Sequence, residues 1–191
     1  MKPTGQEIQD IVGQVTELTW NYAIWWEIVN KTNRERYKDV FEAYPNFFTA
    51  VFCSMQQSIL VIVARLFDER HDVLSLANLV TNLVSTDPGL SKKLNSEIAQ
   101  NQNLIQTCRK LRHKVYGHRD STLTPKQVFV QFPIKPKEFK VLLRCTHQVA
   151  AALAEVHGAN KGVAVLDNFE HCENDAATEL RLIIQRLQSA G

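Results

Sequence analysis

The stretch PNFFTAVFCSMQQSILVIVARLF, residues 45–67, is apolar on nearly every side of a helix, which is typical of a helix at the centre of a bundle. Pro45 suits the first turn, so we expect a helix over residues 46–67. The most apolar run, residues 59–64, is far shorter than the roughly 20 residues that cross a bilayer. The stretch therefore predicts a buried core helix and no membrane partner.

Apolar residues at helical spacing predict further helices on both sides of this one. The charged residues 31–39 suit a connection or a short exposed helix. Asp72 or Ser75 can cap the next helix, Ser91 can cap a longer one, and Gly117 can end it. The predicted helices cover residues 6–29, 76–83, 91–116, 136–157 and 174–188, with a break at residues 160–162.

Residues 119–137 interrupt this helical pattern. They hold three prolines and the β-prone run Val128-Phe129-Val130, so we expect an irregular excursion or a short strand there. The pattern as a whole predicts an all-α bundle with a long central helix pair. A length of 191 residues suits a single domain, residues 1–191, and the 45% of hydrophobic residues can form a core without a metal or a disulfide.

The net charge and the N-terminal residues bear on possible partners and on the cellular location. The net charge is only +2, so any affinity for nucleic acid must come from a local patch. The first ten residues, MKPTGQEIQD, lack the apolar run of a signal peptide, and we expect a cytoplasmic location.

The four cysteines lack a CxxC pair and are expected to be reduced thiols; they are Cys53, Cys108, Cys145 and Cys172. The histidines outside residues 109–119 do not form a zinc spacing, and we expect neither a metal nor a cofactor; they are His71, His147, His157 and His171.

One basic cluster, RKLRHKVYGHR at residues 109–119, carries seven basic or imidazole side chains in eleven positions. It can be read as a solvated face, or as cations that complement the carbonyl end of a helix. Cys108, Leu111 and Val115 continue an apolar stripe, and His118 falls next on it. His118 is therefore either a core histidine or part of an interface. Arg112 lies six residues before His118, which is about 9 Å along the axis of an ideal helix.

An arginine and a histidine together suit RNA cleavage without a metal. The imidazole of His118 can take the proton of a 2′-hydroxyl or protonate the leaving oxygen near neutral pH. The guanidinium of Arg112 can grip the scissile phosphate and stabilise the added negative charge of the transition state. Gly117 would let the backbone leave helical geometry and turn the imidazole toward that guanidinium.

The segment Arg112-(five residues)-His118, with the polar His113 directly after the arginine, resembles the R-x4-6-H signature of HEPN domains, the higher-eukaryote and prokaryote nucleotide-binding helical bundles. The string LRHKVYGHRD, residues 111–120, is similar to the pattern of the abortive-infection (AbiU-type) branch, except that Gly117 stands where alanine is usual. ARLFD at residues 64–68, followed by Ser75 and Leu76, resembles a second element of that branch. The resemblance covers residues 20–120.

The resemblance implies a HEPN-like bundle that forms a homodimer in which two Arg/His motifs meet in one cleft. Many members are metal-independent endoribonucleases of defence or toxin–antitoxin systems, while others bind RNA or nucleotides without cutting. By this resemblance, Arg112 and His118 are catalytic residues that act on single-stranded or loop RNA, and an antitoxin is a possible partner. A non-catalytic binding module and a helical scaffold remain the alternatives.

Other residues are candidates for supporting roles. Arg65 and Asp68 form either an internal ion pair at i, i+3 or an outer layer that orients the cleft. The aromatic residues of the first helix are expected in the core and at the dimer face; they are Trp20, Tyr22, Trp25 and Trp26. The other supporting candidates are His113, Tyr116 and Asp120. The candidate RNA-binding residues are Arg109, Lys110, Lys114 and Arg119.

Overall fold

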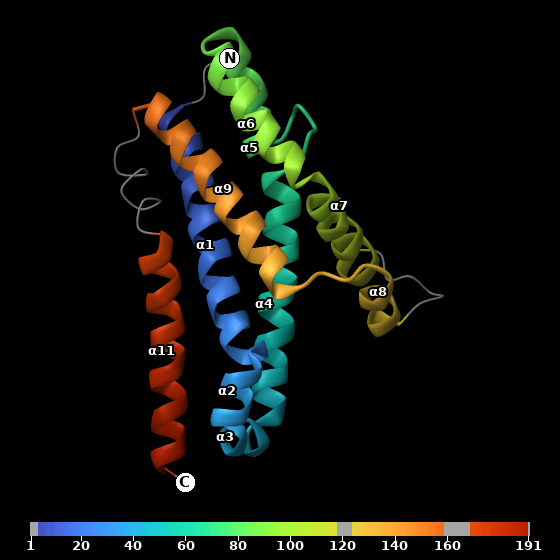
Figure 1. The fold of residues 1–191 in the computed structure, drawn as a ribbon, viewed down its shortest axis with the longest axis vertical. Helices are drawn as coiled ribbons and strands as arrows, with labels where there is room; N and C mark the ends of the chain where they lie inside the picture. The colour runs from blue at the N-terminus through green and yellow to red at the C-terminus, as the bar shows by residue number, and fades with distance from the viewer. Residues whose placement is uncertain (1–3, 118–123, 159–168, 191) are drawn as a thin grey trace.

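The computed structural model describes residues 4–117, 124–158 and 169–190, and it is an all-α bundle with no strand within these ranges. The predicted fold class is confirmed. Figure 1 shows α1 and α4 side by side at the centre, with α9 crossing them and α11 alongside α1. The long helices are α1 (Gly5–Val29), α4 (Pro45–Leu66), α9 (Pro136–Val156) and α11 (Phe169–Ala190). The shorter ones are α2 (Lys31–Arg36), α3 (Lys38–Ala43), α5 (Leu76–Asn82), α6 (Pro88–Gln100), α7 (Gln102–Leu111) and α8 (Pro125–Gln131).

Two clusters of buried side chains hold the bundle together. The larger one lies between α1, α4, α5, α7 and α9, and it includes Val15, Leu60 and Leu142. The smaller one joins the end of α1 to α3, the start of α4 and α11 through Ile28, Phe48 and Ile184, among others. Burial of apolar area at about 25 cal/mol per Å² makes both clusters the main source of stability.

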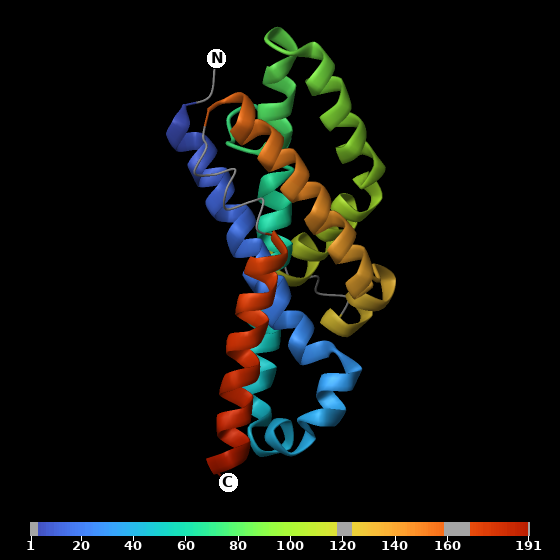
Figure 2. The ribbon, with the colours of Figure 1, turned by 60° about the vertical axis from the view of Figure 1, so that its left-hand side comes forward.

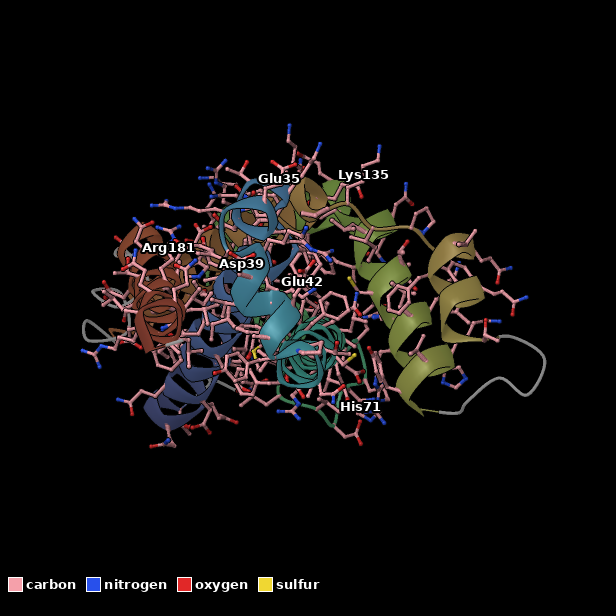
Figure 3. The ribbon with its side chains drawn as sticks, turned by 90° about the horizontal axis from the view of Figure 1, so that it is seen from below. Glu35, Asp39, Glu42, His71, Lys135 and Arg181 are labelled. Carbon is pink, nitrogen blue, oxygen red and sulfur yellow. The ribbon has the colours of Figure 1, made fainter. Side chains whose placement is uncertain are left out.

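Glu27 attaches α11 to the rest of the bundle. Its carboxylate is only 3% exposed and accepts from the Arg181 guanidinium, with Nε to Oε2 at 2.8 Å. The amide of Asn33, on α2, donates to the same oxygen at 2.7 Å. α11 packs against α1, in front of which its upper end lies in Figure 2, and Figure 3 shows Arg181 on the flank of α11. A buried carboxylate needs such partners because its desolvation is costly.

The aromatic residues of α1 do not all lie in the core. Tyr22 and Trp25 are buried, and Trp25 meets Phe139 of α9 edge to face at 5.6 Å. Trp26 is partly buried against the larger cluster. Trp20, however, is 48% exposed. The core prediction is therefore confirmed for Tyr22 and Trp25, and Trp20 lies on the surface.

α4 is less buried than its composition predicts. Its inner face, including Ile59, Leu60 and Leu66, is buried, whereas Phe47 is 55% exposed. By length and composition the whole of α4 could cross a membrane, although its most apolar run, residues 59–64, is short. Core helices of soluble proteins pass the same test, so one such helix does not indicate a membrane protein. In this bundle α4 packs against α1 and α7.

The short strand, one of the two alternatives expected at Val128–Val130, does not form, because these residues lie in α8. Thr124 caps this helix in a capping box: its hydroxyl accepts from the Gln127 amide, and the Gln127 side chain accepts from the Thr124 backbone N–H. Pro125 occupies the first turn. These local start signals outweigh the weak β preference of the β-branched residues.

The long helix expected over residues 91–116 is broken into α6, α7 and a π-helical segment, Arg112–Gly117. The N-terminal cap of α6 is Asp87, whose Oδ1 accepts from the Leu90 backbone N–H at 2.9 Å. Ser91, the expected cap, is instead buried and donates to the Val80 carbonyl. The break falls at Asn101, a poor residue for a helix interior, whose side chain donates to the Glu97 carbonyl.

Other boundaries agree with the sequence or shift by a few residues. Ser75 caps α5 as expected, and Pro45 stands in the first turn of α4. The charged residues 31–39 form α2 and part of α3, and α11 begins before the predicted residue 174. α9 stops before His157, and Gly158 takes the left-handed conformation that ends many helices. The break predicted at residues 160–162 lies outside the described residues.

Candidate functional site

The two sequence elements with the HEPN resemblance meet at one pocket. Residues 64–68 reach it from the end of α4, and Arg112 reaches it from the start of the π-helical segment. The pocket has a volume of about 470 Å³. Its lining residues are Gln14, Val61, Ala64, Arg65, Asp68, Arg70, Asp72, Val73, Leu74 and Arg112. We call it the Arg65–Arg112 pocket.

The loop of residues 67–75 forms one wall of this pocket and is held by its own hydrogen bonds. Ser75 Oγ donates to the Asp68 carbonyl at 2.5 Å and accepts from the Asn78 amide at 3.1 Å. The Asn78 side chain donates to the carbonyls of Arg70 and Val73. Ser75 therefore has two functions: it caps α5 and closes the loop that follows α4.

Asp68 pairs with Arg70 and not with Arg65. Both carboxylate oxygens accept from the Arg70 guanidinium, with Nη2 to Oδ2 at 3.0 Å, and Oδ1 also accepts from the Arg70 backbone N–H. Arg70, chiefly through its side-chain hydrogen bonds, holds the pKa of Asp68 below its ordinary value. The Arg65–Asp68 ion pair, one of the two alternatives from the sequence, is absent from the part of the chain that the structure describes. The reason is that α4 ends at Leu66, so the i, i+3 geometry is lost.

Arg112 begins a π-helical segment. Such turns are rare in proteins as a whole, and those that occur are often found at functional sites. The distance along an ideal helix that was expected between Arg112 and His118 therefore does not apply to this segment. The Arg112 side chain is exposed and makes no ion pair with any acid whose side chain the structure describes. His118, Arg119 and Asp120 lie outside the described residues.

Arg109 has a structural role at the back of the site. Its guanidinium donates to the Phe67 carbonyl at the end of α4, and Nη1 lies 3.3 Å from Glu69 Oε1. Only 24% of its side chain is exposed. A cation at this position complements the unpaired carbonyls at the end of a helix. Arg109 thus joins α7 to the loop of residues 67–75.

Arg109→Ala should lower the free energy of unfolding by about 1–3 kcal/mol, because a carbonyl and a carboxylate lose a charged donor. Arg112→Ala, three residues along the chain, should change it by less than about 0.5 kcal/mol, as surface substitutions usually do. Urea unfolding of the two variants beside the wild type measures the difference. Equal stability of all three proteins would contradict the role assigned to Arg109.

The other candidates of the basic cluster lie at the end of α7 and in the π-helical segment, outside the pocket. The ammonium groups of Lys110 and Lys114 lie over the ring of Phe132, at 5.6 Å and 5.9 Å from its centre. His113 is exposed. Tyr116 is half-buried against the larger core cluster, and burial, more than the neighbouring Cys53, raises its pKa. None of these four side chains lines the Arg65–Arg112 pocket.

Two cysteines are part of the core. Cys108 and Cys145 are buried free thiols, and burial raises their pKa to about 12 and about 11, so both are neutral at physiological pH. Cys53 is exposed on α4. Among the side chains that the structure describes, no group of three or more histidine, cysteine or acidic residues could hold a metal ion.

The sequence did not indicate three of the polar pocket residues as part of a site. Arg70 and Asp72 directly follow the ARLFD element, so their position in the chain was a usable signal. Gln14 carried no such signal, because it lies in α1, far from both elements in the sequence. His71, between Arg70 and Asp72, is exposed and points outward at the edge of the molecule in Figure 3.

Comparison with known proteins agrees with the motif resemblance. A HEPN family model described as AbiU2 matches residues 6–177, which extends well beyond the 20–120 region that carried the resemblance. No curated protein and no solved structure matches the chain.

Proposed function

Because the chain belongs to the AbiU2 family of HEPN domains, an abortive-infection family, we propose that it is a metal-independent endoribonuclease of a defence or toxin–antitoxin system. Single-stranded or loop RNA is the proposed substrate. The observation that carries the proposal is the Arg65–Arg112 pocket, in which Arg112 is exposed and meets no acidic partner within the described residues. A guanidinium in this state is available for a phosphate.

In the proposed reaction the 2′-oxygen of the RNA attacks the adjacent phosphorus, and the bond from phosphorus to the 5′-oxygen breaks. The products are a 2′,3′-cyclic phosphate and a free 5′-hydroxyl. His118 takes the proton of the 2′-hydroxyl or delivers one to the leaving oxygen, which an imidazole can do near neutral pH. Arg112 binds the scissile phosphate through two parallel hydrogen bonds and stabilises its added charge. Asp120 and His113 are proposed to support this pair.

The RNA backbone is proposed to run past the basic surface formed by the end of α7 and the π-helical segment. Lys110 and Lys114, held over Phe132, supply positive charge there, and Arg119 follows them in the sequence. Arg109 contributes less to this surface, because its guanidinium is committed to Phe67 and Glu69. Phosphate contacts of this kind make affinity fall as salt rises.

A homodimer is part of the proposal, because the family pairs two Arg/His motifs in one cleft. Val115, which lies beside the motif, is only partly buried, and a partner subunit would remove its remaining apolar surface from water. A two-fold arrangement uses the same patch on both subunits. Light scattering at micromolar concentration should give the mass of a dimer, and a uniform monomer would contradict the shared cleft.

The direct test incubates the purified protein with end-labelled RNA in excess EDTA. Cleavage should survive the chelator, and the products should carry a 2′,3′-cyclic phosphate and a 5′-hydroxyl. DNA and 2′-O-methylated RNA should resist, because their internal nucleophile is missing or blocked. A requirement for Mg²⁺ would overturn the proposal. Retention of RNA without cleavage would instead favour the alternative, a binding module.

A further inference from the structure

The Arg65–Arg112 pocket contains more positive charge than its own acids compensate. Three arginines and two aspartates line it. Both carboxylates act on Arg70: Asp68 hydrogen-bonds to its guanidinium, and the charge of Asp72 adds to the increase in the pKa of Arg70. Arg65 and Arg112 therefore face the pocket without an acidic partner in the described part of the chain.

Two guanidinium groups that share a pocket repel each other unless an anion lies between them. A phosphate suits this arrangement, because its oxygens accept from both forks at once. The volume of about 470 Å³ also lies in the range of ordinary small-molecule pockets, about 300–1,000 Å³. The pocket is thus large enough for a phosphate together with a sugar or a base.

Gln14 adds a second, independent observation on the α1 side of the pocket. Its Oε1 is buried and has no hydrogen-bond partner in the described structure. An unpaired buried carbonyl oxygen is costly, and each such atom calls for an explanation. A ligand in this pocket would supply the missing partner, either a hydroxyl of a ribose or an amine of a base.

We propose that the Arg65–Arg112 pocket is a ribonucleotide subsite contained in one subunit, in which Arg65 and Arg112 bind the same phosphate and Gln14 hydrogen-bonds to the attached nucleoside. Arg65 then contacts the ligand directly, while Arg70 is a positioning residue that keeps Asp68 from neutralising Arg65. The inference rests on the proposed function for the nature of the ligand, a nucleotide of RNA.

The first test measures binding of the four nucleoside 3′-monophosphates, and of inorganic phosphate, to the full-length protein in EDTA by calorimetry. Arg65→Ala and Arg112→Ala should each weaken nucleotide binding by about ten- to a hundredfold, as expected for loss of a charged hydrogen bond. Arg34→Ala is the matched control, because Arg34 is exposed on α2 and lines a different hollow. Unchanged affinity in Arg65→Ala, or no binding by the wild type at millimolar nucleotide, would overturn the inference.

The second test uses Gln14→Leu, which removes the amide and leaves an apolar side chain of similar bulk. Nucleotide affinity should fall about five- to tenfold while phosphate affinity stays constant. The melting temperature should rise by about 2–4 °C, because an unpaired buried polar atom is removed. Gln148→Leu, at an exposed position on α9, is the control. Equal nucleotide affinity in Gln14→Leu and the wild type would remove Gln14 from the site.

Neither test depends on cleavage, so the two proposals can fail separately. A protein that cuts RNA while Arg65→Ala keeps full nucleotide affinity would overturn the subsite alone. A protein that binds nucleotides through Arg65 but never cuts RNA would overturn the ribonuclease alone.

Discussion

His118→Ala should lower the rate of RNA cleavage by about 10²–10⁴-fold, the usual loss when one acid/base group is removed. RNA binding should persist, because it is assigned to Lys110, Lys114 and Arg119. The melting temperature should stay close to that of the wild type. The measurement is therefore a pair, the cleavage rate in EDTA and the melting temperature, on the variant beside the wild type.

The alternative for His118, a satisfied core histidine, predicts a different pair of results. Loss of its hydrogen bonds would then lower stability by about 1–3 kcal/mol and reduce cleavage only through unfolding. His147→Ala is a useful reference, because His147 is a buried histidine whose Nε2 lies 2.7 Å from Thr19 Oγ1. If His118→Ala melts early like that variant, and its folded fraction cuts normally, His118 has no part in catalysis.

Arg112→Lys should lose nearly as much activity as Arg112→Ala, with kcat/KM falling by about 10²–10³-fold in both, the range for removing one transition-state donor. An ammonium keeps the charge but cannot make the two parallel hydrogen bonds of a guanidinium. Stability should hardly change, because Arg112 is exposed and makes no ion pair within the described residues.

Arg34→Lys is the matched control for this substitution, since it makes the same change on the exposed face of α2. It should leave both cleavage and melting unchanged. Full activity in Arg112→Lys would mean that Arg112 supplies only diffuse positive charge. That result would leave the phosphate without a bidentate partner from this residue.

The sequence was sufficient wherever the signal is local. Proline in the first turn placed the start of α4, and Ser75 placed the start of α5, since both act on the neighbouring backbone. The alternation of apolar residues at helical spacing predicted the all-α class. α8 also has a local signal, the capping box of Thr124 and Gln127, which favours a helix over the short strand that the β-prone residues 128–130 suggested.

Contacts between distant segments could not be read in this way. Helical spacing paired Arg65 with Asp68, but α4 ends between them and Asp68 turns to Arg70. Arg109 was one cation among several in its cluster, and the approach of α7 to the end of α4 assigned it to the Phe67 carbonyl. The pairing of a long charged side chain depends on which partner lies within about 4 Å.

The pocket is the clearest case of this difference. Composition and motif spacing were enough to identify Arg112 and the ARLFD element as candidates, because each motif is a short run of residues. Their meeting in one pocket, and the presence of Gln14 beside them, depend on how α1, α4 and the π-helical segment pack. Packing is set by the fit of many apolar side chains at once, and no short stretch of sequence carries that information.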